Sequence, residues 1–561
     1  MPDDVHRVNA NPMHSSSSLP LRSAPQPQRP PGTGFAPNPI GVRGLLTLGL
    51  LLAIALTPFA LAAEQPVVTV TGGQVRGRLL ADGPGAVFRG LPFAQPPVGE
   101  LRWREPQPVA GWSGVREADH PGPPAAQAAF GWNDTFAAAG REDCLYLDVW
   151  TPAFQPPAHL PVMVWFHGGG NVAGAGGADP LYEGTALIRR GVVLVIVEYR
   201  VGLFGFFAHP ELTHESPHHA SGNYGIMDQI AALQWVRDNI ARFGGDPGNV
   251  TIFGQSAGAI DVVGLLTSPP AAGLFHRAIA QSGAWLIGLP TPTLAEGEQA
   301  GVRTAAKLGA PAPGSLRFLR SLSAATLLQG IEKVGMTPPN VDGWVFTESP
   351  GRVLAAGRGA RVPLLIGNIA IEFAASGGLA EIQKQITSTF GPRAAQALAL
   401  YGLTGASTPP AADPLYGDLV DQWGTDAFRA ACIIEGEWQA AAGNSVWEYQ
   451  FDRAIPPRPK AGHSGDLPYV FGNLYAGGSQ GGEFQEVDRR LSETVQTYWT
   501  NFARAGDPNG PSLPSWPKHD GQTRRFLEFT PEAKVATGVN QRGPICDLFR
   551  ELLAAGTQTP P

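Results

Sequence analysis

The apolar positions of the chain follow two patterns, short continuous runs and longer stretches in which they recur at helical spacing. Continuous runs rich in Val, Ile and Leu predict buried strands at residues 161–166, 191–199, 249–253, 361–367 and 444–450. Between the second and third runs, "MDQIAALQWVRDNIARFGG" has apolar residues at helical spacing and ends in two glycines that suit a helix C-terminus. Strands that alternate with helices predict the α/β class, with a central, mostly parallel sheet and helices on both faces.

The N-terminal segment follows neither pattern. Residues 1–41 are rich in Ser and Pro and have no apolar periodicity, which predicts a disordered leader. The apolar run "LLTLGLLLAIAL" is shorter than the about 20 residues of a membrane-spanning helix, and Ala60 and Ala62 after it have the A-x-A spacing of a cleavage site. These features predict a signal peptide over residues 42–63, cleaved after Ala62 or Ala63. A single anchoring helix is the alternative.

The rest of the chain, residues 64–561, has no internal repeat and no clear linker, and it is predicted to be one large domain. We expect the cleaved protein to be exported, either periplasmic or secreted, without a membrane span. Its three cysteines lack metal-ligand spacing, so no metal site is expected, and an exported protein favours one disulfide and one remaining thiol.

Composition supports a large core and limits the classes of partner. Hydrophobic residues make up 43% of the chain and charged residues 16%. The formal net charge is −7, and because residues 1–62 carry four arginines and two aspartates, the cleaved chain carries −9. An acidic chain without a block of Lys and Arg is not expected to bind nucleic acid or an anionic membrane.

The segment "NVTIFGQSAGAIDVVGLL" places Ser256 between a strand and a helix. This is the context of a nucleophile elbow, the sharp turn that exposes a catalytic serine. The flanking glycines relieve crowding in the turn, and the helix N-terminus favours developing negative charge. The sequence therefore predicts Ser256 as a nucleophile, and an idle serine in a glycine-rich turn is the alternative.

A serine nucleophile needs a histidine base and an acid that orients the histidine, and in elbow enzymes these follow the serine in the order acid, histidine. His463 follows a strand-like run, whereas His519 lies in the polar loop "SWPKHDGQ" and is expected on the surface. Glu372 is the favoured acid because "RVPLLIGNIAIEF" places it just past a buried strand. The other candidate acids are Asp342, Glu348, Asp421 and Asp426.

Backbone amides that stabilise a negatively charged oxygen should complete such a site. The segment "VWFHGGGN" offers them at the end of another predicted strand, because glycine lets the backbone approach a substrate closely. We assign these oxyanion-hole donors to Gly169, Gly170 and the amide of Ala257.

Several long segments resemble the type-B carboxylesterase/lipase family, which has the α/β-hydrolase fold and includes cholinesterases. They run from about residue 66 to 551 and include "FRGLPFAQPPVGELRWREPQPV", "EDCLYLDVWTP", "SGNYGIMDQIAALQWVRDNIARFGGDPGNVTIFGQSAGA" and "AGHSGDLPYVFG". The resemblance implies a serine carboxylic-ester hydrolase that acts through an acyl-enzyme on small to medium esters, without a cofactor. It implies Ser256, Glu372 and His463 as the triad, and Ser282 as a serine that supports the acid and the base.

The chain also departs from the family pattern. Gln255 precedes the serine where many relatives carry Glu, and Asn171 follows the three glycines where a bulky aromatic residue is common. The resemblance further implies that Cys144 is free and that Cys432 and Cys546 are a candidate disulfide.

Two other functions fit parts of the sequence. "GGGNVA" matches a dinucleotide-binding fingerprint, with Glu198 as the ribose-binding acid, but the helix breakers in "GAGGADPLYEG" separate it from any helix. Some relatives in the resembled family have lost the triad and act in adhesion, whereas every catalytic position here holds a competent residue. Ester hydrolysis is therefore the predicted function, and a binding or adhesion protein is its alternative.

Overall fold

The structure is a computed structural model that describes residues 65–554, apart from residues 82, 84, 155–158, 286–290, 332–337, 457–459 and 476–481. The predicted leader (1–41) and signal peptide (42–63) lie outside the described residues, and the domain boundaries stay predictions. No described helix is both long enough and apolar enough to cross a membrane.

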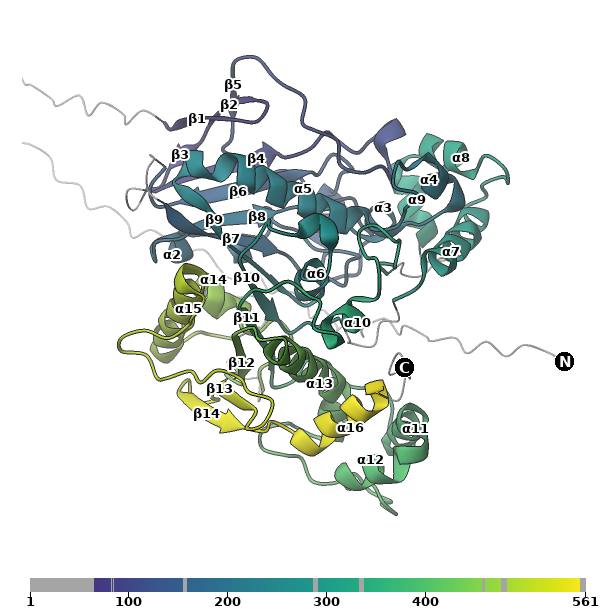
Figure 1. Cartoon of the computed structure of the whole chain (residues 1–561), viewed down its shortest axis with the longest axis vertical. Helices are drawn as coiled ribbons and strands as arrows, with labels where there is room; N and C mark the ends of the chain where they lie inside the picture. The colour runs from purple at the N-terminus through teal and green to yellow at the C-terminus, as the bar shows by residue number, and fades with distance from the viewer. Residues whose placement is uncertain are drawn as a thin grey trace, which may run out of the picture. The chain divides into compact units, whose positions relative to one another are not determined.

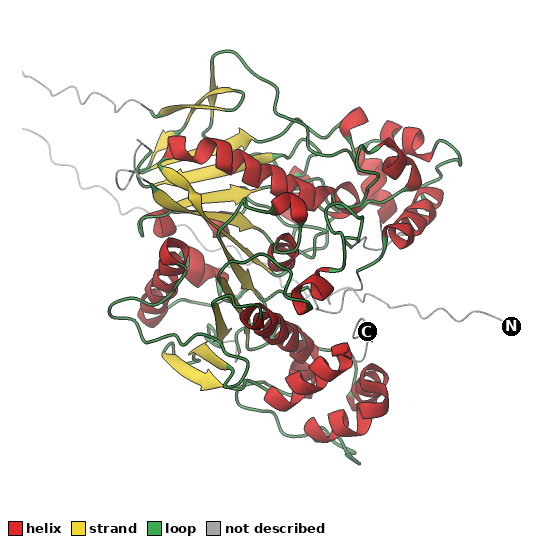
Figure 2. Cartoon of the chain, in the orientation of Figure 1, coloured by secondary structure: helices red, strands yellow, loops and turns green. Residues whose placement is uncertain are grey.

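The centre of the fold is a large mixed sheet whose middle strands are parallel (Figures 1 and 2). In spatial order the parallel strands are β8 (Val193–Val197), β7 (Leu160–Phe166), β9 (Gly245–Gln255), β10 (Arg277–Gln281), β11 (Leu364–Ile369), β12 (Val446–Phe451) and β13 (Arg525–Phe529). Antiparallel strands complete the edges: β6 (Tyr146–Thr151), β4 (Ala86–Pro92) and β3 (Arg78–Leu79) beside β8, and β14 (Val535–Val539) beside β13. A separate small sheet contains β1 (Val67–Val70), β2 (Gly73–Arg76) and β5 (Val115–Glu117).

The described helices connect these strands and cover both faces of the sheet. They are α1 (Asp134–Ala139), α2 (Thr185–Ile188), α3 (Gly202–Phe206), α4 (Pro210–Glu215), α5 (Tyr224–Asn239), α6 (Ala257–Leu265), α7 (Leu294–Lys307), α8 (Ser315–Ser321), α9 (Ala324–Ile331), α10 (Pro350–Ala355), α11 (Leu379–Phe390), α12 (Ala394–Leu400), α13 (Leu419–Ala441), α14 (Leu467–Phe471), α15 (Glu486–Ala505) and α16 (Gly543–Ala554).

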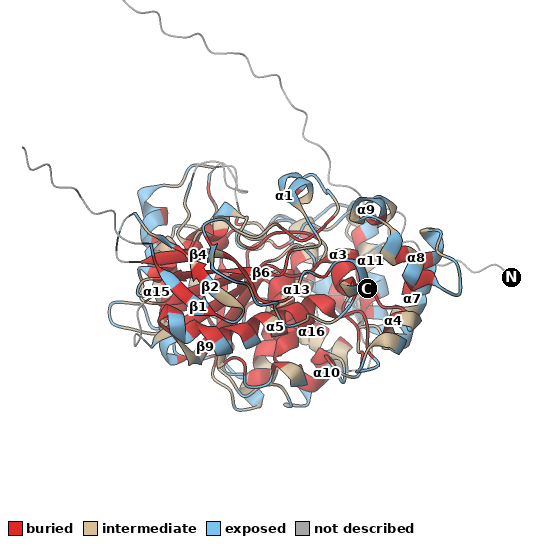
Figure 3. Ribbon diagram, turned by 90° about the horizontal axis from the view of Figure 1, so that it is seen from above, coloured by how far each residue is buried: buried red, intermediate tan, exposed pale blue. Residues whose placement is uncertain are grey.

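The continuous apolar runs are explained by this double cover. In β7, Val162 and Val164 join the core on the side of α5 and α6, whereas Met163 and Trp165 join the core on the side of α14 and α15. Each successive side chain of a strand points to the opposite face, so a strand covered on both faces needs apolar residues throughout. Figure 3 shows this burial in the sheet and the helices beside it, whereas α1 is largely exposed.

The predicted elements are confirmed, with shifts of a few residues at their ends. The five apolar runs form β7, β8, β9, β11 and β12, and the predicted helix forms α5. The chain leaves the turn after α5 through Gly244, whose φ of 83° is left-handed, as the paired glycines indicated. The sequence reading missed β10, because "RAIAQ" is short and begins and ends with polar residues. The α/β-hydrolase fold class is confirmed.

The candidate disulfide between Cys432 and Cys546 is wrong in this structure, where both thiols are free and buried. Cys432 on α13 packs against the sheet, and its thiol lies 3.7 Å from the carbonyl oxygen of Gly367 in β11. Cys546 on α16 instead belongs to a separate apolar cluster and lies 3.6 Å from the carbonyl oxygen of Gln541. The two thiols therefore belong to different cores. Cys144 is free and buried, as expected.

Candidate active site

The candidate catalytic residues come together beyond the carboxyl ends of the parallel strands, the edge where α/β proteins place their sites. The glycine loop follows β7, Ser256 follows β9 directly, and Glu372 lies three residues beyond β11. The loop after β12 brings His463 to the same edge, because its neighbour Gly462 forms a β-bridge with Ile371.

Ser256 is held on a strained turn between β9 and α6. Its φ of 56° and ψ of −126° are unusual for a non-glycine residue, and its amide donates to the carbonyl oxygen of Gln281 in β10 over 2.9 Å. A Cβ on Gly254 would collide with the backbone of Gly258, and one on Gly258 would collide with the carbonyl oxygen of Phe166. The flanking glycines are therefore required by close packing, and Ser256 alone in this turn stays partly exposed.

Glu372 and His463 form a short ion-pair-type hydrogen bond. The Nδ1 of His463 lies 2.6 Å from the Oε2 of Glu372, and the glutamate side chain is fully buried. The other carboxylate oxygen accepts the amide of Ile369 over 2.9 Å, while the amide of Glu372 donates to the hydroxyl of Thr425 over 3.0 Å. A buried carboxylate so placed sets the tautomer of the imidazole: Nδ1 carries the proton and Nε2 keeps a lone pair.

That lone pair faces the residue next to the serine. The side-chain nitrogen of Gln255 lies 3.2 Å from the Nε2 of His463, so the Gln255 amide donates to it. The ring of Phe373 packs beside the imidazole, with 4.4 Å between ring centroids. Among the described residues, no hydrogen bond joins the hydroxyl of Ser256 to His463, although the adjacent residue reaches it.

The glycine loop lies beside the candidate nucleophile with free amide groups. A Cβ on Gly168 would lie 3.1 Å from the Cβ of Ser256. Gly169 and Gly170 have φ of 113° and 66°, conformations that favour glycine. Within the described part of the chain, the amides of Gly169, Gly170 and Ala257 have no hydrogen-bond acceptor.

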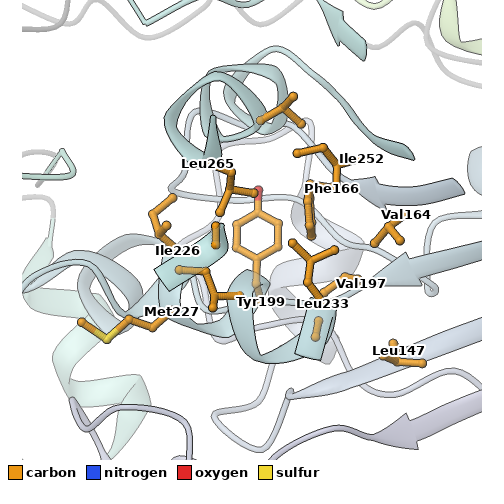
Figure 4. Close-up of a cluster of buried hydrophobic side chains, with 14 of the residues drawn as sticks. Leu147, Val164, Phe166, Val197, Tyr199, Ile226, Met227, Leu233, Ile252 and Leu265 are labelled. Atoms are coloured by element: carbon orange, nitrogen blue, oxygen red, sulfur yellow. The ribbon is translucent and has the colours of Figure 1, made fainter. Parts of the chain in front are cut away.

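A buried polar group that the sequence reading missed lies beneath this loop. Asn171 donates to Asp261 of α6 over 2.8 Å, and Gln229 of α5 donates to the same carboxylate over 2.6 Å. Burial raises the pKa of Asp261 to about 6, although the two amide donors act against this. The signal in the sequence was the acid itself, in the otherwise apolar run that follows the serine. Figure 4 shows the apolar side chains of this region, including Tyr199 and Leu265.

Ser282 is placed differently from what the resemblance implies. It follows β10 with a φ of 50°, and its amide donates to the carbonyl oxygen of Gly367 over 2.8 Å. Its hydroxyl is buried and has no hydrogen-bond partner among the described residues, so it reaches neither Glu372 nor His463. Asp466, three residues after His463, is the polar group that anchors this region: it accepts from Gln281 and from the Tyr449 hydroxyl, each over 2.9 Å.

Two other sequence expectations are settled by the same geometry. His519 is buried rather than on the surface. Its Nδ1 lies 2.8 Å from the carboxylate of Glu448, a residue of β12. The polarity of its loop does not reveal this buried partner. Glu198 accepts the amides of Ala125 and Gly176, and the chain after the glycines passes through turns before α2, so the dinucleotide fingerprint lacks its helix.

No cluster of three or more metal-ligating side chains is found among the described residues. The arrangement instead combines a strained serine, an oriented imidazole and unpaired amides at one edge of the sheet. Such a set can attack a carbonyl carbon and stabilise the oxyanion that forms.

Comparison with known sequences finds a matching family model and similar characterised proteins. A sequence model of the carboxylesterase family matches residues 64–397 and 413–544. The medium-chain fatty acyl-CoA hydrolase precursor of Anas platyrhynchos is 35% identical over 544 residues, which cover 89% of this chain and 94% of that protein. The fumonisin B1 esterase of Sphingopyxis macrogoltabida is 34% identical over 87% of this chain and 91% of that protein.

Solved structures agree with this comparison. A PNB esterase superimposes with a TM-score of 0.75 at 30% identity and covers 86% of this chain and 99% of that chain. A carboxylesterase of Geobacillus stearothermophilus superimposes with a TM-score of 0.73 at 33% identity, again over 86% of this chain and 99% of that chain.

Proposed function

The chain belongs to the carboxylesterase family and is a serine carboxylic-ester hydrolase, and from that premise we propose that Ser256, His463 and Glu372 are its catalytic triad. The observation that carries the proposal is the 2.6 Å contact between Nδ1 of His463 and the buried Glu372. It orients the imidazole at the edge where β9 ends in the serine turn.

In the first half of the reaction, the Nε2 of His463 takes the proton of the Ser256 hydroxyl as the serine oxygen attacks the ester carbonyl. For this step Nε2 exchanges the Gln255 amide for the serine hydroxyl. Glu372 stabilises the resulting imidazolium, and the amides of Gly169, Gly170 and Ala257 donate to the oxyanion. Each such donor is worth about 2.7–4 kcal/mol of transition-state stabilisation.

The protonated His463 then gives its proton to the leaving alcohol, which completes the first half and leaves the acyl group on Ser256. A water molecule then loses a proton to Nε2 and attacks the acyl carbonyl through a second tetrahedral intermediate, which the same amides stabilise. As this intermediate collapses, His463 gives that proton to the Ser256 oxygen, which releases the acid and restores the serine hydroxyl. No metal or cofactor is needed at any step.

Exposed aromatic side chains beside the site support apolar acyl or alcohol groups as its substrates. Trp132 is 54% exposed, and its ring lies 3.3 Å from the position that a Cβ on Gly169 would take. Phe373, which packs on His463, is 41% exposed. A panel of aryl esters of increasing acyl length tests this: kcat/KM should rise from acetate to medium chains, and a steady fall would contradict it.

The test of the triad is Ser256→Ala, with labelling by a fluorophosphonate as the second measurement. The variant should lose turnover of a simple aryl acetate by several orders of magnitude and should not be labelled. Ser321→Ala, an exposed serine at the end of α8, is the matched control and should keep both properties. Retained turnover or labelling in folded Ser256→Ala would assign the nucleophile to another residue, whereas folded wild type that is not labelled at Ser256 would favour the binding-protein alternative.

We also propose that the chain is exported after cleavage next to Ala62 or Ala63, on the basis of the short apolar run and the small residues that follow it. Expression of the whole chain in a bacterium with a general secretion pathway provides the test. Mass spectrometry should find a mature protein that begins at Ala63 or Glu64 outside the cytoplasm, and an uncleaved membrane-bound chain would support the anchoring helix.

A further inference from the structure

The oxyanion-hole glycines and the nucleophile helix are joined by a buried side-chain bridge. Asn171, which follows the three glycines, donates through Nδ2 to Oδ1 of Asp261, 2.8 Å away. Asp261 lies in α6, five residues after Ser256, and its other oxygen accepts from Nε2 of Gln229 over 2.6 Å. Asp261 and Gln229 are completely buried, and Asn171 is 8% exposed.

This carboxylate is buried without a cationic partner. No ion pair to Asp261 is found in the described part of the chain, and its two hydrogen-bond donors are neutral amides. The titratable groups that face it are His167, at the end of β7, and Tyr199, just after β8. Burial of a carboxylate without a cationic partner is unfavourable, so Asp261 is not explained by stability.

The loop end of the bridge is also under strain. Asn171 has a φ of 57°, in the left-handed region that non-glycine residues rarely adopt, although Asn adopts it more readily than most. Its carbonyl oxygen is fixed by the amide of Gly202 over 2.6 Å, and its side chain is fixed by Asp261. Asn171 is therefore held at both its backbone and its side chain, directly beside Gly169 and Gly170.

We propose that Asp261 is a positioning residue that holds the Gly169 and Gly170 amides at a fixed distance from the Ala257 amide by binding Asn171. The inference rests on the proposed function, because it concerns the geometry of the assigned oxyanion hole. The amides belong to two separate segments, the loop after β7 and the first residue of α6. The Asn171–Asp261 hydrogen bond joins these two segments directly.

A carboxylate suits this role better than a neutral side chain. Both of its oxygens only accept, so the amide groups of Asn171 and Gln229 are both forced to point their nitrogens at it. The oxygens of these two amides have no partner among the described residues, so no other contact sets their orientation. An aromatic residue is common at the position of Asn171 in the family. The presence of Asn here is explained by its hydrogen bond to Asp261.

The test compares Asp261→Asn with wild type in turnover and in binding of an aryl trifluoromethyl ketone, which adds to the serine to form a tetrahedral adduct. Because a misplacement of the amides on the order of 1 Å costs about 100-fold, kcat should fall about 10- to 100-fold with KM changed less than about twofold. The ketone should bind more weakly by the same factor as kcat, because the oxyanion exists in the adduct and not in the bound ester.

A matched control is Asp342→Asn, because Asp342 is also a buried carboxylate that accepts from neutral groups, the amides of Trp344 and Phe346. It should change the unfolding midpoint without changing kcat or ketone affinity. Asn171→Gly removes the bridge from the loop side while it tolerates the left-handed backbone, so it tests the proposal if Asp261→Asn does not fold. The double variant Asn171→Gly/Asp261→Asn should lose no more than the worse single variant.

Wild-type kcat and ketone affinity in Asp261→Asn, or additive losses in the double variant, would overturn the positioning role. Failure of the proposed function is seen separately, in Ser256→Ala: that variant would then keep its turnover and its reaction with the ketone.

Discussion

Four residues around the site hold a left-handed backbone conformation: Ser464, next to His463, and three residues that directly or closely follow a strand of the sheet. Asn171, Ser256 and Ser282 have φ of 57°, 56° and 50°. The amide of Ser256 donates to the last residue of β10, and that of Ser282 donates to Gly367 in β11. The turns at Ser256 and Ser282 are thus fixed by the neighbouring strand, which is how a rigid sheet maintains conformations that cost about 1–3 kcal/mol each. Asn171 is held instead by Gly202 and Asp261.

Replacement of Glu372 tests the acid of the proposed triad. In Glu372→Gln, the new amide can donate to Nδ1, which moves the imidazole proton to Nε2 and removes the lone pair that accepts the serine proton. We expect kcat for an aryl acetate to fall by about 10³- to 10⁴-fold. Glu372→Asp keeps the charge and should lose less. Equal activity of Glu372→Gln and wild type would assign the acid to another residue.

The pH dependence of stability tests the charge state of Asp261. Its folded pKa of about 6 lies above the usual 3.8, because burial outweighs the donors from Asn171 and Gln229 and the weak attraction of His167. The folded state therefore binds the proton more tightly, and the free energy of unfolding contributed by this group is lost as the pH rises from about 4 to 6. Two pKa units correspond to about 3 kcal/mol.

Urea unfolding of wild type and Asp261→Asn at a series of pH values measures this contribution. The free energy of unfolding of Asp261→Asn should rise relative to that of wild type as the pH increases from about 4 to 6, and the variant should keep this advantage at pH 7. The bridge would then lower stability at neutral pH while it supports turnover, a trade-off found at functional sites. A difference that stays constant with pH would show that Asp261 does not titrate there.

At the scale of elements, the sequence predicted what depends on local pattern and missed what depends on tertiary contacts. Apolar runs identified β7, β8, β9, β11 and β12, because strands covered on both faces need apolar side chains throughout. The short β10 was missed, since only its neighbours in the sheet make it a strand.

The candidate site shows the same division. Ser256, Glu372 and His463 were predicted from two signals that the sequence itself carries. Each residue follows a strand-like run, and the three occur in the order serine, acid, histidine. The Asn171–Asp261 contact and the Gln255–His463 contact each join segments that are distant in the sequence. The spacing of apolar residues along the chain does not predict such contacts. The Cys432–Cys546 pairing failed for this reason too: the resemblance implied a pair, but the two helices present the thiols to different cores.

The packing of α6 against the sheet depends on the absence of a side chain at Gly258. A Cβ there would overlap with the carbonyl oxygens of Phe166 and His167, so the helix and its first amide would have to move away from β7. We expect Gly258→Ala to lower the free energy of unfolding by about 1–3 kcal/mol, the usual cost of overpacking, and to lower kcat. Gly521→Ala, where a Cβ meets open space, is the matched control for both measurements.

At the scale of the whole molecule, the buried apolar side chains of the described residues form three clusters. Two lie on the opposite faces of the sheet, and the third joins α11, α12, α13 and α16 (Figure 1). Helix α13 belongs to two of them: Cys432 faces the sheet, whereas Ile433 and Ile434 face the third cluster. The site lies at the edge of the sheet between the two larger clusters, and α13 also contacts it, because the hydroxyl of Thr425 accepts the amide of Glu372.

The three buried cysteines report on whether these clusters unfold together. Burial raises the pKa of all three thiols, so none should react with an alkylating reagent in the folded protein at pH 8. Local opening requires less free energy where less apolar surface is buried, and Cys546 lies in the smallest cluster. As urea increases, Cys546 should therefore be labelled at a lower concentration than Cys144 and Cys432.

Pulsed alkylation followed by peptide mass spectrometry measures this order on protein purified without a reductant. Complete unfolding is the internal control and should reveal three reactive thiols, whereas a single reactive thiol would mean that Cys432 and Cys546 pair after all. Activity followed over the same urea series should survive the labelling of Cys546 and disappear with that of Cys432, because β11 leads to Glu372. Simultaneous labelling of all three cysteines would instead show that α13 unites its two clusters into one cooperative unit.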